Sequence, residues 1–126
     1  MPSSKNPKPK NRRRIETGRR FERLAARFYT DNGFEIIARN WRAGRREIDL
    51  IVRKQDVIAF VEVKASVGKK FGHPIERVDK KKIAHMTDSA RQYIISNDLS
   101  GVDFRFDVIT FQSGKLEHYP NAFEVA

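Results

Sequence analysis

The stretch REIDLIVRKQDVIAFVEVKA, residues 46–65, contains two apolar runs joined by a short polar connection. The first run predicts a β-strand over residues 46–53 and the second a strand over residues 57–64, because both are rich in Val, Ile and Phe. The polar residues Arg53, Lys54, Gln55 and Asp56 lead from the first run into the second. Two strands so closely joined indicate a β-hairpin, which fixes the centre of the predicted sheet.

One face of the second strand carries charge. Val61 and Val63 alternate with Glu62 and Lys64, and alternate side chains of a strand point to opposite faces. A hairpin loop of two or four residues puts Asp49 on the same face as Glu62, either opposite or diagonal to it, with Cβ atoms roughly 4.5 to 8 Å apart. Carboxylates that face each other across a ladder destabilise the pairing unless a cation neutralises them.

A divalent metal site is one interpretation of this pair. Mg²⁺ binds through one or two carboxylates while keeping several waters, so Asp49 and Glu62 could hold Mg²⁺ or Mn²⁺, with the backbone carbonyl of Val63 as a further ligand. Lys64 would orient or help to deprotonate an attacking water and stabilise charge on a phosphate. Glu22, on a preceding helix, could face the same site as another ligand. This arrangement predicts metal-assisted phosphodiester hydrolysis.

A solvated strand face is the other interpretation. Glu62 and Lys64 would then form a surface ion pair worth about 0 to 1 kcal/mol. Glu47 lies near Asp49 in the sequence, but its face depends on how the strand begins. The hairpin alone leaves both interpretations open.

The rest of the chain completes an α/β order. Apolar spacings of three and four residues predict helices over residues 18–32 and 80–96, and Asp79 is the expected N-cap of the second helix. Alternating or apolar segments predict strands over residues 34–41 and 103–111, with a short edge strand near the C-terminus. The order αβββαβ predicts a mixed sheet flanked by helices, in which the helical crossover brings the last long strand parallel to the third.

Charge divides the chain into two parts. Lys and Arg number 26 against 16 acidic residues, and the first 14 residues contain basic residues but no acid. We therefore expect residues 1–14 to be a disordered basic tail and residues 15–126 to be a single domain. Arg12, Arg13 and Arg14 would be attracted to phosphate backbones, although a solubility tail has the same composition.

Composition also excludes several classes of protein. The chain has no cysteine, so thiolate metal sites and cysteine nucleophiles are excluded. No apolar run approaches the roughly 20 residues of a membrane-spanning helix. The N-terminal residues contain no hydrophobic stretch of the kind found in a secretory signal, so we expect a soluble, cytoplasmic protein without membrane contact.

Several segments together resemble the YraN family of small bacterial proteins. The segments, in chain order, are GRRFERLAARFYTDNGF, REIDLI, FVEVKAS, FGHPIERVDKKK, ARQYI and RFDVITF. The resemblance covers residues 16–125. That family is grouped with the PD-(D/E)xK nucleases, close in core fold to archaeal Holliday junction resolvases. The resemblance therefore implies a restriction-endonuclease-like core.

The resemblance also implies residue roles. Asp49 matches the motif aspartate, Glu62 and Lys64 match the Glu-x-Lys pair, and Glu22 matches the acid of the first helix. Lys82 matches a basic position of the second helix, where it would contact nucleic acid. The family usually has Gly-Glu at both glutamates, whereas this chain has Phe21-Glu22 and Arg46-Glu47.

Two functional classes follow. The first is a metal-dependent endonuclease acting on DNA, including branched or otherwise structured DNA. The alternative is a non-catalytic nucleic-acid-binding protein on a nuclease scaffold, and a lower-ranked option is an adaptor whose basic arm binds an acidic protein. Junction resolvases commonly act as dimers, so the analogy also suggests a homodimer.

Overall fold

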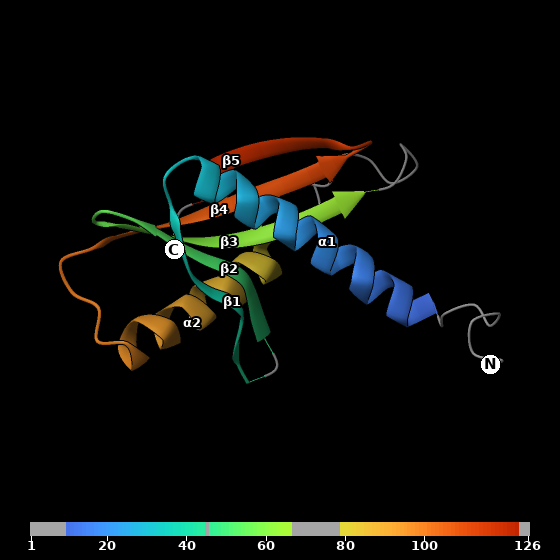
Figure 1. Cartoon of the computed structure of the whole chain (residues 1–126). Helices are drawn as coiled ribbons and strands as arrows, with labels where there is room; N and C mark the ends of the chain where they lie inside the picture. The colour runs from blue at the N-terminus through green and yellow to red at the C-terminus, as the bar shows by residue number, and fades with distance from the viewer. Residues whose placement is uncertain (1–9, 45, 67–78, 124–126) are drawn as a thin grey trace, which may run out of the picture.

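A mixed five-stranded sheet with one helix on each face is the architecture of this chain (Figure 1). The computed structural model describes residues 10–44, 46–66 and 79–123; the side chains of residues 10–17 and of Arg46 lie outside that description. Within these ranges, no helix is long and apolar enough to span a membrane. The mixed sheet flanked by helices confirms the fold class predicted from the sequence.

The elements follow the predicted order, with one more full strand at the C-terminal end. They are α1 (Lys10–Asp31), β1 (Glu35–Ala43), β2 (Arg46–Lys54), β3 (Val57–Ser66), α2 (Lys80–Ser96), β4 (Asp103–Gln112) and β5 (Lys115–Phe123). The strands lie side by side in sequence order. The pair β3–β4 is parallel, as the helical crossover predicts, and the other three pairs are antiparallel. The expected short edge strand is the nine-residue β5.

Alternation along β3 separates two cores. Ala59 and Val61 are fully buried on the side covered by α1, whereas Ile58 and Phe60 are fully buried on the side covered by α2. A strand that is apolar on both faces occupies the centre of a sheet, and β3 lies between β2 and β4. The charged residue Glu62 follows this doubly buried segment directly, so the site begins where the two cores end.

Helix α1 begins at Lys10, earlier than the predicted start at residue 18. The expected disorder of residues 10–14 is therefore wrong, while residues 1–9 lie outside the described part of the chain. Residues 10–17 contain Lys, Arg and Glu, which are good helix formers, and no proline or glycine. The high density of positive charge suggested disorder. Residues that favour a helix nevertheless extend toward the N-terminus as far as Pro9. The predicted end at Asn32-Gly33 is confirmed, with Gly33 at φ 86°.

A buried polar network attaches α1 to the sheet. Asp107 of β4 is fully buried and accepts a hydrogen bond from the Tyr29 hydroxyl at 2.8 Å. It also accepts from Arg105 Nε at 2.9 Å and from the Asn121 N–H at 3.0 Å, and His118 Nε2 lies 2.9 Å from it. Burial alone would raise the pKa of Asp107, but these bonds together lower it below its ordinary value. The network supplies partners for a carboxylate in the middle of an apolar layer.

The β2–β3 hairpin has a two-residue loop, Gln55-Asp56, which fixes its register. Lys54 pairs with Val57, and the described ladder ends with Leu50 opposite Val61. Asp49 and Glu62 are the next residues beyond this last described pair. Gln55 adopts φ 54°, in the left-handed region that favours glycine.

Replacing Gln55 by glycine should stabilise the hairpin. A non-glycine residue in the left-handed region costs about 1 to 2 kcal/mol, part of which glycine loses again through backbone entropy. We expect Gln55→Gly to raise the free energy of unfolding by about 0.5 to 1 kcal/mol in urea denaturation. Gln92→Gly, the same change inside helix α2, is the control and should lower it by about 1 kcal/mol. If both variants were less stable than wild type, the proposed backbone strain at Gln55 would be wrong.

Candidate active site

The ladder between β1 and β2 is irregular where Asp49 lies. Asn40 faces Asp49 in the register and has φ 49°, in the left-handed region. Ile48 packs in the core beside α2, but Leu50, two residues later, packs in the core beside α1. Residues two apart on a regular strand share a face, so the strand twists sharply at Asp49. Asp49 lies at this change of face.

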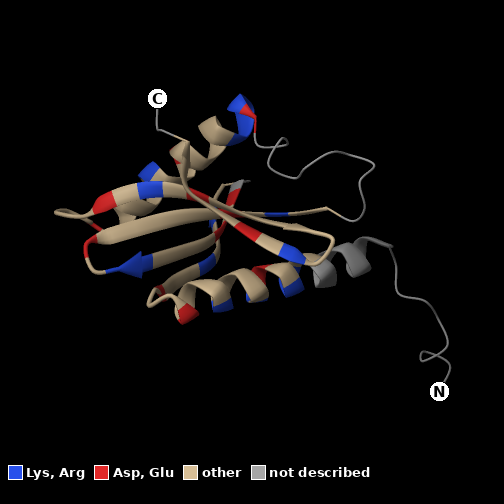
Figure 2. Cartoon of the chain, turned by 90° about the horizontal axis from the view of Figure 1, so that it is seen from above, with Lys and Arg blue, Asp and Glu red and all other residues tan. Residues whose placement is uncertain are grey.

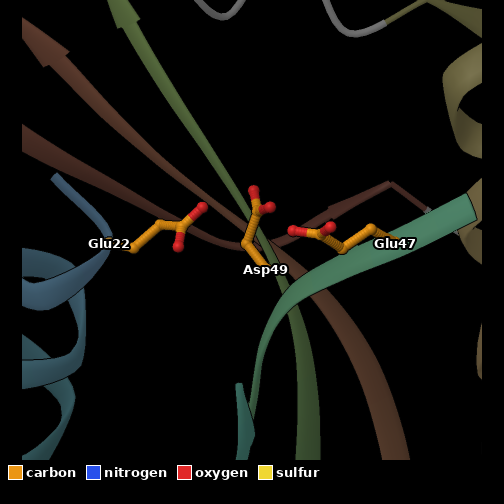
Figure 3. A group of neighbouring side chains, drawn as sticks. All are labelled: Glu22, Glu47 and Asp49. Carbon is orange, nitrogen blue, oxygen red and sulfur yellow. The ribbon is translucent and has the colours of Figure 1, made fainter. Parts of the chain in front are cut away.

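Three carboxylates meet at this point. Glu22 of α1 and Glu47 and Asp49 of β2 each offer an oxygen, and these oxygens lie within 4.8 Å of one another. Figure 3 shows Glu22 extending from the helix toward Asp49 and Glu47 extending toward it from the opposite side. With its amide nitrogen turned toward the carboxylates, Asn40 donates to Glu47 Oε1 at 2.7 Å and to Glu22 Oε2 at 3.0 Å. One amide therefore bridges two of the three acids.

Asp49 also closes the open end of the β2–β3 ladder. Its Oδ2 accepts a hydrogen bond from the Val63 N–H at 2.8 Å. Burial raises the pKa of Asp49 well above its ordinary value, and the nearby charge of Glu62 raises it further, although the Val63 N–H opposes this. Burial likewise raises the pKa of Glu22, with Glu47 adding to the effect. The cluster therefore carries more negative charge than its surroundings stabilise.

Glu62 is the fourth acid, and two lysines contact one of its oxygens. Glu62 is 3% exposed, and its Oε1 lies 3.3 Å from Lys64 Nζ and 3.1 Å from Lys82 Nζ. Its other oxygen, Oε2, is buried and has no hydrogen-bond partner among the described residues. A buried acceptor without a partner costs about 1 to 3 kcal/mol, more when it is charged. Glu62 therefore has one oxygen neutralised by two ammonium groups and one buried oxygen without a partner among the described residues.

The donor set fits a hard divalent cation. All four acids offer carboxylate oxygens, which Mg²⁺ and Mn²⁺ prefer. The raised pKa of Asp49 and the partnerless oxygen of Glu62 are both features that a bound cation would relieve. Glu22, Glu47, Asp49 and Glu62 are the residues that could hold it.

A groove lies beside the carboxylates. It has a volume of about 450 Å³ and is lined by Gly18, Arg19, Glu22, Asn40, Arg42 and Glu47. One wall comes from α1 and the other from β1 and the start of β2. Arg42 Nε lies 3.2 Å from Glu47 Oε2, so the guanidinium group of Arg42 lies at the edge of the acidic cluster. The groove gives a solvent-side approach to Glu22 and Glu47.

The structure gathers the acids and lysines that the sequence suggested and adds others. Glu22 and Asp49 lie in the carboxylate cluster, and Glu62, whose charge acts on both, pairs with Lys64. The side chains of Arg12, Arg13 and Arg14 lie outside those that the structure describes. Lys82 was expected to contact nucleic acid, and here its ammonium contacts Glu62.

Glu47 and Asn40 are the residues that sequence analysis did not assign. Glu47 precedes Asp49 by two positions, so strand alternation was a usable signal for it. Asn40 carries no such signal, because its place depends on the left-handed turn of its own backbone beside Asp49.

Comparison with known sequences assigns the family. The profile of the uncharacterised protein family UPF0102 matches residues 21–111, a span that includes all the acids and both lysines of the site. The chain belongs to the UPF0102 family. This membership confirms the resemblance to the YraN family.

Relatives of this UPF0102 protein match most of its length. A UPF0102 protein of Sulfurihydrogenibium sp. is 38% identical over 112 residues, 89% of this chain and 97% of the relative. One from Chloroherpeton thalassium is 41% identical over 95 residues, 75% of this chain and 74% of the relative. One from Clostridioides difficile is 38% identical over 104 residues, 81% of this chain and 91% of the relative. The similarity is thus spread along the chain.

Removing the charge of Asp49 should stabilise this UPF0102 protein at high pH. Because the folded-state pKa is raised, the stability linked to the Asp49 proton is present below the ordinary value of 3.8 and is lost as pH rises through the raised pKa. Asn cannot ionise, yet its carbonyl can still accept from the Val63 N–H. In EDTA, Asp49→Asn should raise Tm by a few degrees at pH 8, with the gain shrinking as pH falls.

Asp56→Asn, in the exposed hairpin turn, is the matched control for this measurement. It removes the same charge at a solvated position and should shift Tm little at either pH. A stability gain for Asp49→Asn that did not depend on pH would contradict the raised pKa.

Proposed function

We propose that this UPF0102 protein is a metal-dependent endonuclease that hydrolyses phosphodiester bonds in DNA, including branched or otherwise structured DNA. The observation that supports the proposal is the cluster of Glu22, Glu47 and Asp49, with the charge of Glu62 acting on Asp49 and with Lys64 paired to Glu62. Three residues, Asp49, Glu62 and Lys64, complete the motif that the family resemblance implies.

The acids would hold Mg²⁺ or Mn²⁺. Asp49, Glu62 and Glu22 would be side-chain ligands, with Glu47 beside them and the backbone carbonyl of Val63 as a further ligand. When bound, such a cation neutralises charge on a phosphate and makes a coordinated water more acidic. The ligand set is partly buried, and there the attraction between a cation and a carboxylate is stronger than at a solvated surface.

Lys64 supplies the group that acts on the phosphate and the water. Its side chain is 29% exposed and its ammonium lies 3.3 Å from Glu62 Oε1, so the carboxylate positions a lysine that is still reached by solvent. An ammonium in that position donates hydrogen bonds to a phosphate oxygen as charge develops there. It also orients the attacking water, or accepts its proton if the lysine is deprotonated.

Lys82 and Asn40 position the acids and do not act on the substrate in this proposal. Lys82 shares Glu62 Oε1 with Lys64 and leaves Oε2 facing away from both ammonium groups. Asn40 holds Glu22 and Glu47 through its two donor hydrogens. The side chains around the acids therefore fix their orientation before any cation is bound.

Cleavage should depend on Glu62. We would measure hydrolysis of labelled duplex, single-stranded, flap and four-way-junction DNA with Mg²⁺, Mn²⁺ or EDTA. Wild-type protein should give a metal-dependent product, and Glu62→Gln should reduce the rate by about a hundredfold or more. Glu35→Gln, the same change at an exposed position of β1, is the control and should cleave like wild type.

Metal binding gives a readout besides cleavage. Millimolar Mg²⁺ should raise the Tm of wild type, because a ligand that binds only the folded state stabilises it, and should raise the Tm of Glu62→Gln much less. DNA binding without product at any metal concentration would overturn the enzyme assignment and favour the non-catalytic binding protein. Equal cleavage by Glu62→Gln would overturn the site.

A further inference from the structure

We propose that the strand to be cut lies in the groove between α1 and β1, with its phosphates held by arginines on both walls. This inference rests on the proposed nuclease function and adds the path of the nucleic acid across the site. Its starting observation is that two adjoining hollows, of about 450 and 160 Å³, share Arg19, Glu22 and Asn40. Together they form one groove, and two of the acids, Glu22 and Glu47, line it.

Arginines line both walls of this groove. Arg19 and Arg23 come from α1 and are four positions apart, so they share one face of the helix. Arg39 and Arg42 come from β1 on the other wall. All four side chains are exposed. Figure 2 shows basic residues spaced along the outer side of α1. The acids thus lie between two pairs of cations.

The four arginines differ in what they contact. Arg42 pairs with Glu47 at 3.2 Å, and the charge of Arg19 acts on Glu22. Arg23 and Arg39 have no carboxylate within ion-pair distance among the described residues. These two guanidinium groups are therefore available to an anion without breaking a contact in the site.

A phosphate backbone is the partner that this arrangement fits. Guanidinium groups bind phosphate through paired N–H donors, and a nucleic acid strand presents phosphates at regular intervals. A strand in the groove can place phosphates on both walls and one phosphodiester above the acids. The carboxylates between the arginines would repel an isolated anion, so the binding energy comes from the flanking phosphates and holds the central one in place.

The test is DNA binding by full-length protein in EDTA, where no metal-dependent cleavage occurs. We would measure fluorescence anisotropy of a labelled duplex and a labelled single strand at several KCl concentrations. The variant is Arg23→Gln combined with Arg39→Gln. The matched control is Arg27→Gln, on the same helix, whose side chain is 81% exposed and lies 4.0 Å from Asp31.

We expect the double variant to bind several-fold more weakly and to lower the magnitude of the salt slope by about 2 for duplex DNA, since each lost phosphate contact removes about 0.9. Arg27→Gln should leave the slope nearly unchanged. Equal slopes for wild type and the double variant would overturn the groove as the binding path. Thermal melts should be alike for all three proteins, because the replaced side chains are exposed.

The outcomes separate this inference from the proposed function. If wild type binds and cuts DNA while the double variant binds as well as wild type, the groove is not the binding path, and the proposed nuclease function is supported. If wild type binds through these arginines but never cuts with Mg²⁺ or Mn²⁺, the proposed nuclease function is wrong, and the groove is supported as the binding path. If wild type binds anionic vesicles but no DNA or RNA at low salt, both fail.

Discussion

Repulsion among four acids at one end of the sheet is the constraint on which the rest of the site depends. Glu22, Glu47, Asp49 and Glu62 come from α1, β2 and β3, and the structure offsets their charge with separate contacts. Val63 donates its N–H to Asp49, Asn40 donates to two glutamates, and two lysines neutralise one oxygen of Glu62. Each contact relieves part of the repulsion and leaves part of it.

The two helices contribute opposite charges to this balance. They cover opposite faces of the sheet, yet Glu22 of α1 and Lys82 of α2 both act on the same group of acids. The described β2–β3 ladder ends at Leu50 and Val61, and at this end charged groups from both helices act on Asp49, which follows the last pair. The end of the ladder is therefore where charge from both sides can be combined.

Much of the fold and part of the site followed from local sequence patterns. Strand alternation put Glu62 and Lys64 on one face, and the short polar connection limited Asp49 to positions beside Glu62. These patterns sufficed because a two-residue periodicity survives in any regular strand. The start of α1 was missed because a run of Arg and Lys has both the charge of a disordered tail and the propensity of a helix.

Other parts of the site depend on contacts between distant segments. The left-handed Asn40, the change of facing at Asp49 and the approach of Lys82 to Glu62 all arise from packing between elements. No local pattern marks an asparagine that bridges two acids, and a lysine at the start of a helix looks like an ordinary solvated residue. The sequence therefore identified candidate site residues, but it did not identify the side chains that contact them.

The Tyr29–Asp107 hydrogen bond has a consequence for the acid on the same helix. A helix packed on a sheet can rotate about its own axis, and a bond from one of its side chains to a buried carboxylate fixes that angle. Glu22 precedes Tyr29 by seven residues, which is about 20° from two full turns. The two side chains therefore point in nearly the same direction from the helix axis, and the Tyr29 phenol, two turns along the same helix, sets the rotation at which Glu22 enters the acidic cluster.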